Sequence, residues 1–374
     1  MGYPVTDYVQ AMTKACQSGF SATGDLRIYK RVVLGGFVLA AIMFVFSLQG
    51  VKTTASLHPG PDAGIALLDK WQTLVKPSKV QTIAAATSRE LIEQLRGHNL
   101  WEERLPSAVP PVVLERYPAD LAQLQTDKKK KAFLNTLLPI AMVALSEVLD
   151  ERRQLVHVLE KYQERPQEFS DPQKGNASAV DWTDPLSSKE RKFITSLTRK
   201  YRTTSVPTLL RRVDMVPVSL IMAQGAIESS WGTSRFVSKG NNLFGIMTWD
   251  GEGIVPADRE DGKIHRAAAF DSLLDSVRSY ILMLNRVEAY NQFRTIRQRT
   301  TDPVALAAGL LNYSERGGVY VSDIGRLIEY NSLRDYDNLA LLDGKKDVLN
   351  AELAPSAKVS EAGFSFGLGR LLSK

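Results

Sequence analysis

The stretch from Val218 to Ser229 constrains the fold more than any other part of the chain, because a helix built from it is apolar almost all round. Its valine, leucine, isoleucine, methionine and alanine residues leave no wide polar face on a helical wheel. A helix of this kind is buried in the centre of a domain. Pro217 suits the first turn, since the N–H that proline lacks is not needed there. We therefore expect this helix to lie in a core, covered on all sides.

Glu228 is the only carboxylate in that helix, one residue before its end. Gln224 lies one turn earlier on the same strip, so Glu228 emerges where a core helix reaches the surface. A carboxyl group there is partly desolvated, which raises its pKa and favours the protonated form that a general acid needs near neutral pH. The alternative is a solvated carboxylate at a helix end, which is mildly unfavourable with the helix dipole.

The residues that follow Glu228 indicate a sugar-binding site. Gly232 is suited to end the helix, and GNNLFGIMTW, residues 240–249, adds amide and aromatic side chains. Aromatic faces stack on sugar rings, and amide groups hydrogen-bond hydroxyl and acetamido groups, although each of these residues could equally belong to a core. We assign Phe244 to the core. The residues predicted to bind saccharide are Gln224, Trp231, Asn242 and Trp249.

The chain resembles a known family of proteins in several segments. The segments AQGAIESSWGTSRF and NNLFGI together resemble the glucosaminidase domain of bacterial peptidoglycan hydrolases, a group that includes flagellar rod-associated muramidase-like proteins and autolysins. The closer resemblance is to bacterial Bax-type proteins. It rests on NNLFGIMTWDGEGIVPADREDGKIHRAAAFDS, on YSERGGVYVSDI and on the upstream KKKKAFLNTLLPIAMVALSEVLDERRQL, and covers about residues 128–335.

The resemblance implies a mainly α, lysozyme-like fold with a small β-lobe. It also implies an enzyme that cuts a β-1,4 bond on the reducing side of N-acetylglucosamine in peptidoglycan, with Glu228 at the position of the family's general acid. That role agrees with the chemistry, since glycoside cleavage needs a proton delivered to the leaving oxygen. A muramidase or lytic transglycosylase on the same fold, and a non-catalytic wall-binding scaffold, remain alternatives.

A second carboxylate is expected from the segment GIVPADREDGKIHRAAAF, which has the pattern of a β-hairpin with Asp261-Gly262 as its turn. The resemblance places a catalytic carboxylate on this lobe, and the candidates are Asp258 and Glu260, with Glu252 further upstream. A gapless comparison favours Asp258, where related hydrolases often have glutamate. The acetamido group of the substrate could act instead, and each carboxylate could also be a solvated hairpin charge.

The motif YSERGGVYVSDI, residues 313–324, resembles the tyrosine-containing loop beside the family's cleft. Tyr313 matches the cleft tyrosine, which could orient the acetamido group or a water molecule. Tyr320 matches a second, substrate-contacting tyrosine, or it simply packs. The flanking segments Ser272 to Arg286 and Pro303 to Leu311 are amphipathic helices that we assign to the core.

The uncharged run VVLGGFVLAAIMFVFSL, residues 32–48, is long enough to cross a bilayer. Basic residues crowd its N-terminal edge, so the positive-inside rule leaves residues 1–31 in the cytoplasm and the catalytic domain in the periplasm or cell-wall space. We expect an uncleaved, single-pass anchor in the cytoplasmic membrane. A cleaved signal peptide is the competing interpretation, but no small-x-small cleavage site follows. A buried core helix is a third.

The remaining organisation follows from polar, Pro- and Gly-rich stretches. Helical patterning indicates helices from about Ile65 to Arg96 and again from Lys128, with a break or kink at Pro139. The apolar segment near Pro139 contains too many polar residues to be a second membrane span. The expected segments are a tether (49–64), a helical region of unknown role (65–165), a linker (166–189), the catalytic domain (190–341) and a C-terminal tail (342–374).

Composition limits the cofactors and partners. The 374 residues carry a formal net charge of +6, which suits a polyanion such as an acidic cell-wall polymer. Cys16 is the only cysteine, and the histidines are scattered, so we expect no disulfide, no metal site and no cofactor. The expected partners are peptidoglycan glycan strands and the membrane, with no nucleic acid.

Overall fold

The computed structural model describes residues 74–102, 107–162, 186–249, 252–257, 259, 262 and 264–343. The predicted membrane anchor, the tether, most of the linker and most of the tail lie outside these residues, so their assignments stay predictions.

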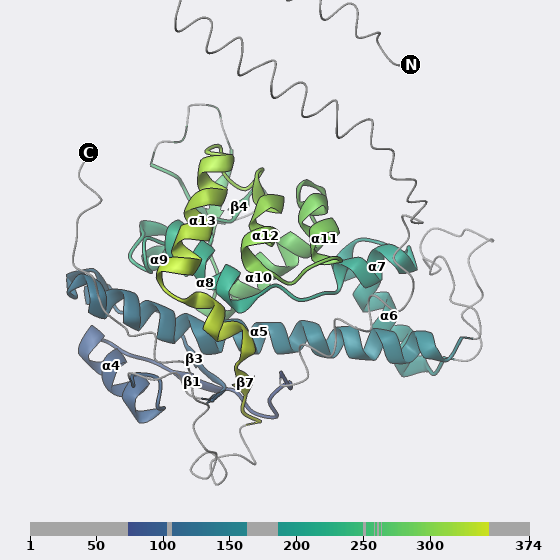
Figure 1. Cartoon of the computed structure of the whole chain (residues 1–374), viewed down its shortest axis with the longest axis horizontal. Helices are drawn as coiled ribbons and strands as arrows, with labels where there is room; N and C mark the ends of the chain where they lie inside the picture. Colours follow the sequence, from purple (N-terminus) through teal and green to yellow (C-terminus); the bar gives the residue numbers. More distant parts are fainter. Residues whose placement is uncertain are drawn as a thin grey trace, which may run out of the picture. The chain divides into compact units, whose positions relative to one another are not determined.

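Helix α8 (Val218–Glu228) occupies the centre of the described fold (Figure 1). Its residues from Val218 to Ala226 are all buried, which confirms the core helix expected from the sequence. It is covered by α5 (Thr126–Glu160), α12 (Pro303–Ala307), α13 (Gly318–Tyr330) and the 3₁₀ segment η5 (Leu333–Asn338). Pro217 directly precedes the helix at its N-cap.

The sequence predicted a break or kink at Pro139, and helix α5 runs through this proline without a break. A proline inside a helix costs about 3 kcal/mol, because one hydrogen bond is lost and the ring crowds the preceding turn. Nearly every residue from Ala132 to Leu149 is buried, and this packing outweighs that cost. Among the described helices, α5 alone is long and apolar enough to cross a membrane, but 94% of its most apolar 18-residue window is buried in the protein.

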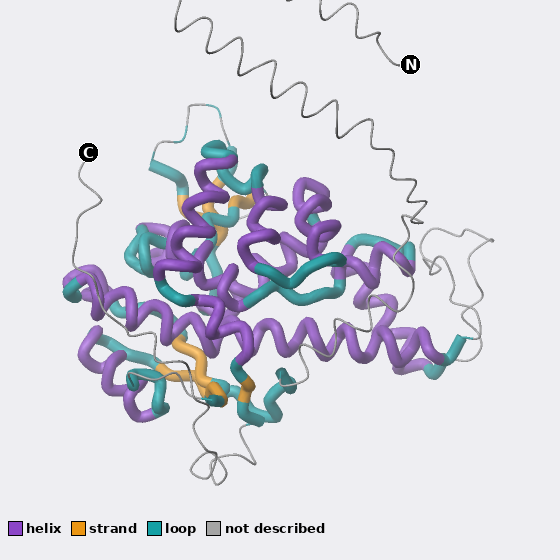
Figure 2. Tube along the Cα trace, viewed as in Figure 1, coloured by secondary structure: helices purple, strands orange, loops and turns teal. Residues whose placement is uncertain are grey.

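Shorter helices complete the mainly α-helical fold that the sequence predicted (Figure 2). Several begin with a side-chain cap that satisfies free N–H groups; Ser187, for example, forms a capping box with Glu190 before α6. The helix at Leu273–Arg286 and the one at Val206–Arg212 confirm segments predicted from the sequence. The further helices are α6 (Ser188–Tyr201), α7 (Val206–Arg212), α9 (Arg235–Gly240), α10 (Leu273–Arg286) and α11 (Asn291–Arg297), with η3 (Glu288–Tyr290) and η4 (Ala308–Leu310).

The predicted hairpin is present as part of a small antiparallel sheet. Strand β5 (Gly253–Ile254) and strand β4 (Met247–Thr248) both pair with β6 (Arg266–Ala268), in the order β4-β6-β5. A Cβ at Gly253 would lie 2.6 Å from the Ala267 carbonyl oxygen, so the close approach of β5 to β6 requires glycine. We name this sheet and its connections, residues 247–268, the β-lobe.

The upstream region forms short strands and one helix on the side of α5 away from α8 (Figure 1). Strand β1 (Gln81–Ile83) pairs in parallel with β3 (Val112–Leu114), and α4 (Ser88–Gly97) follows β1. Of the helical pattern expected from about Ile65 to Arg96, the part within the described residues is correct only for α4. A strand of three residues is too short to give a recognisable alternation in the sequence.

The region 65–165 and the predicted catalytic domain share one hydrophobic core, so no domain boundary separates α5 from α8. Strand β2 (Ala108–Val109) pairs in parallel with β7 (Ala340–Leu341), which joins the two regions. Close by, the Ser78 backbone N–H donates to an Asp343 carboxylate oxygen at 2.9 Å. The upstream residues are therefore a structural part of the unit that contains the candidate site.

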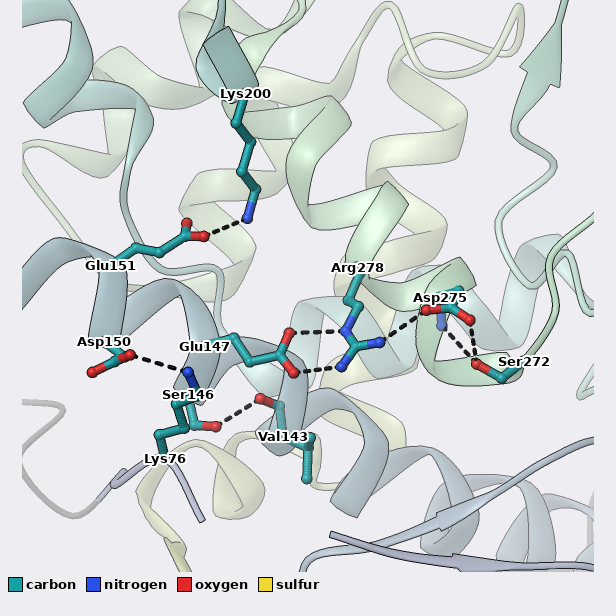
Figure 3. A network of polar contacts seen from close by, with 10 residues as sticks. All are labelled: Lys76, Val143, Ser146, Glu147, Asp150, Glu151, Lys200, Ser272, Asp275 and Arg278. Carbon is teal, nitrogen blue, oxygen red and sulfur yellow. Dashed lines mark hydrogen bonds and ion pairs between the residues drawn. The ribbon is translucent and has the colours of Figure 1, made fainter. Parts of the chain in front are cut away.

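Ion pairs along the polar side of α5 hold the same regions together (Figure 3). Arg278 of α10 donates to both carboxylate oxygens of Glu147, at 2.8 and 2.5 Å. Neighbouring carboxylates of α5 bind Lys200 of α6 at 2.6 Å and Lys76 at 3.2 Å. These groups are partly exposed, so each pair stabilises the fold by about 1 kcal/mol or less.

Four arginines, of which Arg152, Arg294 and Arg297 are buried, bind the carbonyl ends of three helices at a common junction. Arg152 and Arg297 donate to the last carbonyls of α7, Arg294 to those of α10, and Arg212 to those of α6. Asp214 supplies a nearby carboxylate, 3.8 Å from Arg152 and 3.6 Å from Arg297. Positive side chains at helix C-termini complement the helix dipole and satisfy carbonyls that have no partner within the helix.

We predict that Asp214→Asn, which removes only a charge, destabilises the protein by about 3 to 5 kcal/mol, because it deletes the carboxylate that faces two buried guanidinium groups. Urea unfolding followed by circular dichroism measures the loss. The matched control is Asp150→Asn, which breaks a partly exposed pair with Lys76 and should cost about 1 kcal/mol or less. Equal losses in the two variants would contradict this account of the junction.

Candidate active site

Glu228 is the last residue of α8, and its side chain is partly buried at the point where the helix reaches the surface. Burial raises the pKa of this carboxyl above its ordinary value of 4.5. A hydrogen bond with Tyr320 and the positive charge of Arg316 act in the opposite direction without cancelling the effect of burial. This is the environment that the sequence predicted for Glu228.

A left-handed turn follows Glu228 at once. Ser230, Trp231 and Gly232 have φ angles of +50°, +59° and +80°. The left-handed region costs about 1 to 2 kcal/mol for each non-glycine residue, so surrounding contacts must stabilise the turn. The Ser229 hydroxyl accepts the Gly232 N–H at 2.8 Å, and the Trp231 N–H donates to the Ala226 carbonyl at 2.9 Å. The helix therefore ends sharply, directly after the carboxyl group.

Tyrosines from separate segments surround that carboxyl group. Burial first, and then the charge of Glu228, raise the pKa of Tyr290 to about 12. Burial also raises the pKa values of Tyr280, Tyr313 and Tyr320, and Glu228 contributes to each of these shifts. The sequence identified Tyr313 and Tyr320 through their motif but missed Tyr280 and Tyr290, because nothing local distinguishes them from ordinary core tyrosines.

Gln224 connects two of these tyrosines inside the core. Its side chain is 0% exposed, so it is not in a position to contact a substrate, contrary to the sequence-based prediction. The Tyr280 hydroxyl donates to Gln224 Oε1, and Gln224 Nε2 donates to the Tyr320 oxygen at 2.9 Å. Tyr320 also acts on Glu228, because a hydrogen bond from its hydroxyl lowers the pKa of that carboxyl group.

Tyr313 makes a different contact from the one expected. Its hydroxyl donates to the Phe244 carbonyl oxygen at 2.8 Å, and its ring stacks on Tyr320 with centroids 5.6 Å apart and an interplanar angle of 3°. Phe244 stacks on Tyr280 at 4.0 Å and is buried, which confirms its assignment to the core. Tyr320 is thus the tyrosine that reaches the carboxyl group, and Tyr313 supports its ring.

Asn242 is also a structural residue in this fold. It is 1% exposed, and its amide nitrogen donates to the Ile246 and Ala268 carbonyls at 2.8 and 2.9 Å. Its oxygen accepts the Ile246 N–H at 3.0 Å. The amide that we expected to bind saccharide instead fixes the loop before β4 to strand β6.

The two tryptophans lie in unlike surroundings. Trp231 packs on α5, where it meets Phe133 edge-on at 5.8 Å and Lys130 Nζ at 5.1 Å from the ring centre. Trp249, on the β-lobe, is 65% exposed. An exposed indole on a lobe beside a carboxyl-bearing helix leaves a flat apolar face available to a ligand.

Of the three candidates for the second carboxylate, the described residues include only Glu252. Asp258 and Glu260 lie outside the described residues, so their roles stay predictions. Glu252 lines a cavity of about 520 Å³ on the β-lobe, together with Gly253, Ile254, Arg266 and Ala269. Within the described part of the chain, no group of three His, Cys, Asp or Glu residues is arranged to hold a metal ion.

The arrangement around Glu228 is chemically suited to proton transfer. A partly desolvated carboxyl retains its proton to higher pH than a solvated one, and Tyr320 offers a hydrogen bond to the carboxylate that remains after the proton has left. A Cβ at Gly245 would lie 3.7 Å from Glu228 Oε2, so this glycine approaches the carboxyl group without a side chain that could cover it.

Comparison with known proteins agrees with this chemistry. Residues 205–333 match the glucosaminidase family, described as mannosyl-glycoprotein endo-beta-N-acetylglucosaminidase. Protein bax of Escherichia coli (strain K12) is 29% identical over 221 residues, covering 55% of this chain and 69% of that protein. The catalytic domain of the autolysin Auto from Listeria monocytogenes is 20% identical, with a TM-score of 0.26, over 41% of this chain and 90% of that chain. Residues 205–333 therefore match the glucosaminidase family, in a chain that is similar to protein bax.

Proposed function

We propose that the protein is a membrane-anchored peptidoglycan hydrolase that cleaves the β-1,4 bond after N-acetylglucosamine, with Glu228 as the general acid. The observation that carries the proposal is the partly buried carboxyl group of Glu228 at the end of α8. Burial raises the pKa of this group, and it lies within the segment that matches the glucosaminidase family. The helical fold with its β-lobe is compatible with a lysozyme-like cleft.

In the proposed reaction, Glu228 gives its proton to the glycosidic oxygen as the bond from the anomeric carbon to that oxygen breaks. The oxocarbenium-like carbon is then attacked by water, or first by the substrate's acetamido oxygen, and the proton released from water completes the balance. Tyr320 would stabilise the Glu228 carboxylate through their hydrogen bond. Asp258 is the preferred group to activate the water, with Glu260 and the acetamido group as alternatives.

Substrate would be held by the exposed Trp249, whose indole face suits a sugar ring. Trp231 is only partly exposed, so only the exposed part of its ring would contact the substrate. The run at residues 32–48 would anchor the chain in the cytoplasmic membrane, with the catalytic domain in the periplasm or cell-wall space.

We predict that Glu228→Gln lowers the release of muropeptides from purified sacculi by about 10²- to 10⁴-fold, because the proton donor is lost while its shape is kept. Glu329→Gln, on the solvent side of α13, is the matched control and should retain wild-type activity. Equal release by the Glu228 variant and wild type would mean that Glu228 is not the acid.

The products of the same digestion test the bond specificity. Mass spectrometry of the released fragments should find reducing N-acetylglucosamine ends. Reducing N-acetylmuramic acid ends would instead indicate a muramidase, and anhydromuramic ends a lytic transglycosylase. If neither the wild-type protein nor the variants release fragments, and all of them still bind sacculi, the result would favour the wall-binding scaffold.

We predict that Glu228→Gln also stabilises the folded protein at neutral pH. Because burial raises the pKa of Glu228, ionisation costs the wild-type fold stability as pH rises above the unfolded value of 4.5 and through the folded value. The neutral glutamine avoids this loss. Melting temperatures of the two proteins should therefore be similar below pH 4.5 and diverge, with the variant higher, at pH 8. A constant difference across this range would contradict the raised pKa.

We predict that Asp258→Asn lowers activity by about 10²-fold or more, whereas Glu260→Gln leaves it near wild type, if Asp258 activates the water. Initial rates on sacculi, measured at one pH for both variants, give the comparison. Near-wild-type rates in both would assign that step to the acetamido group of the substrate.

A further inference from the structure

A directional hydrogen-bond chain leads from the protein interior to Glu228. The Tyr280 hydroxyl of α10 donates to Gln224 Oε1 of α8, and Gln224 Nε2 donates to the Tyr320 oxygen of α13 at 2.9 Å. Tyr280 and Gln224 are 0% exposed and Tyr320 is 1% exposed, so bulk water does not compete for these bonds. The Tyr320 oxygen already accepts one hydrogen, so its own hydrogen is available to Glu228, whose pKa it lowers.

The direction of this chain depends on which end of the Gln224 amide faces which tyrosine. If the amide turned over, Oε1 would face Tyr320 and accept its hydrogen, which would withdraw that hydrogen from Glu228. Nε2 would then face Tyr280, whose hydrogen has no other acceptor among the hydrogen bonds of the described residues. A buried hydroxyl hydrogen without an acceptor is costly, so Tyr280 favours the orientation in which Tyr320 donates to the carboxyl group.

Ring packing keeps both hydroxyls in place. Phe244 stacks on Tyr280 with centroids 4.0 Å apart, and Tyr313 stacks on Tyr320 at 5.6 Å. Each tyrosine ring therefore has little freedom to swing its hydroxyl to another partner, and the amide between them is the remaining variable.

We propose that Tyr280 and Gln224 are positioning residues, which fix the direction in which Tyr320 donates to Glu228 and so leave the second carboxyl oxygen to carry the transferable proton. The proposal rests on the proposed function of Glu228 as the acid. Neither residue touches the substrate, and Gln224 is suited to the role because a single buried side chain presents an acceptor at one end and a donor at the other.

Several groups besides Tyr320 influence the titration of Glu228, and the experiment has to separate them. Among the described residues, Arg316 is the charged group that acts on it, and it is exposed and paired with Asp323. The titratable or charged groups that face Glu228 are Tyr280 of α10, Tyr290 of η3, Tyr313 and Arg316 of the loop before α13, and Tyr320 of α13. Only Tyr280 and Tyr320 belong to the chain through Gln224.

The test is Tyr280→Phe, which removes one hydroxyl and keeps the ring. We expect kcat on sacculi to fall about tenfold with little change in KM, since one hydrogen bond to the carboxylate is lost. The basic limb of the pH–activity profile should move to higher pH, because a carboxyl group without this donor holds its proton more tightly. The matched control is Tyr117→Phe, another buried tyrosine, whose hydroxyl donates to the Phe133 carbonyl, and its profile should not move.

A double-mutant comparison distinguishes positioning from general damage to the core. If Tyr280 acts only through Tyr320, Tyr280→Phe/Tyr320→Phe should have the same pH profile as Tyr320→Phe alone. Gln224→Met, similar in size but without an amide oxygen to withdraw the Tyr320 hydrogen, should leave the basic limb near its wild-type position, and Tyr280→Phe should have no further effect on the limb in the Gln224→Met background. Additive shifts in either double mutant, or an unmoved limb in Tyr280→Phe, would overturn the proposal.

A second readout does not depend on hydrolysis. Carbon-13 NMR of labelled glutamate carboxyl groups, with Glu228→Gln to assign the signal, gives the pKa of Glu228 directly in wild type and in Tyr280→Phe. A higher pKa in the variant supports the chain even if no sacculus is cleaved, and an unchanged pKa refutes it even if the protein proves to be a hydrolase.

Discussion

The complete burial of α8 is the constraint on which the rest of the structure depends. A helix without a polar face has to be covered on all sides, and α5, α12, α13 and η5 supply that cover. At Gly225 the approach is so close that a Cβ would lie 2.9 Å from the Leu137 side chain of α5. Because α5 precedes the segment that matches the glucosaminidase family, the catalytic module of this chain cannot be defined by residues 205–333 alone.

The same burial gives Glu228 its properties. The helix is too apolar to end in water without a transition, and the carboxyl group lies at that transition, where desolvation raises its pKa. The left-handed turn through Ser230 and Trp231 stops the helix one residue later. Trp231 is held by Phe133 and Lys130 of α5, so the element that covers α8 also supports the turn that ends it.

Periodicity predicted those parts of the fold that local sequence determines. The core helix α8, the amphipathic α10, the short α7 and the hairpin of the β-lobe all have a repeat or a turn signal within a few residues. The continuity of α5 through Pro139 could not be predicted, because it depends on packing by residues distant in sequence. The pairs β1–β3 and β2–β7 are two or three residues long and join distant segments, which no local pattern records.

The site was predicted to a similar extent. The desolvation of Glu228 could be predicted from the apolar sequence of the helix that carries it. The partners that each site residue contacts could not be predicted in this way. Gln224 and Asn242 were expected to bind sugar because amides often do, and both instead satisfy buried partners, one between tyrosine hydroxyls and one between a loop and a strand. Tyr280 looked like a core residue in the sequence, and it is one, yet it takes part in the hydrogen bonding that reaches the carboxyl group.

The contact between Ser78 and Asp343, beside the β2–β7 pair, has a consequence for synthesis and for mechanical load. The described unit begins and ends at one place, so strand β2 has no partner until almost the whole unit has been translated. A pull on the chain at either end is applied to this short contact first, and α8 lies behind it. A tether attached there could transmit force without opening the helix that carries Glu228.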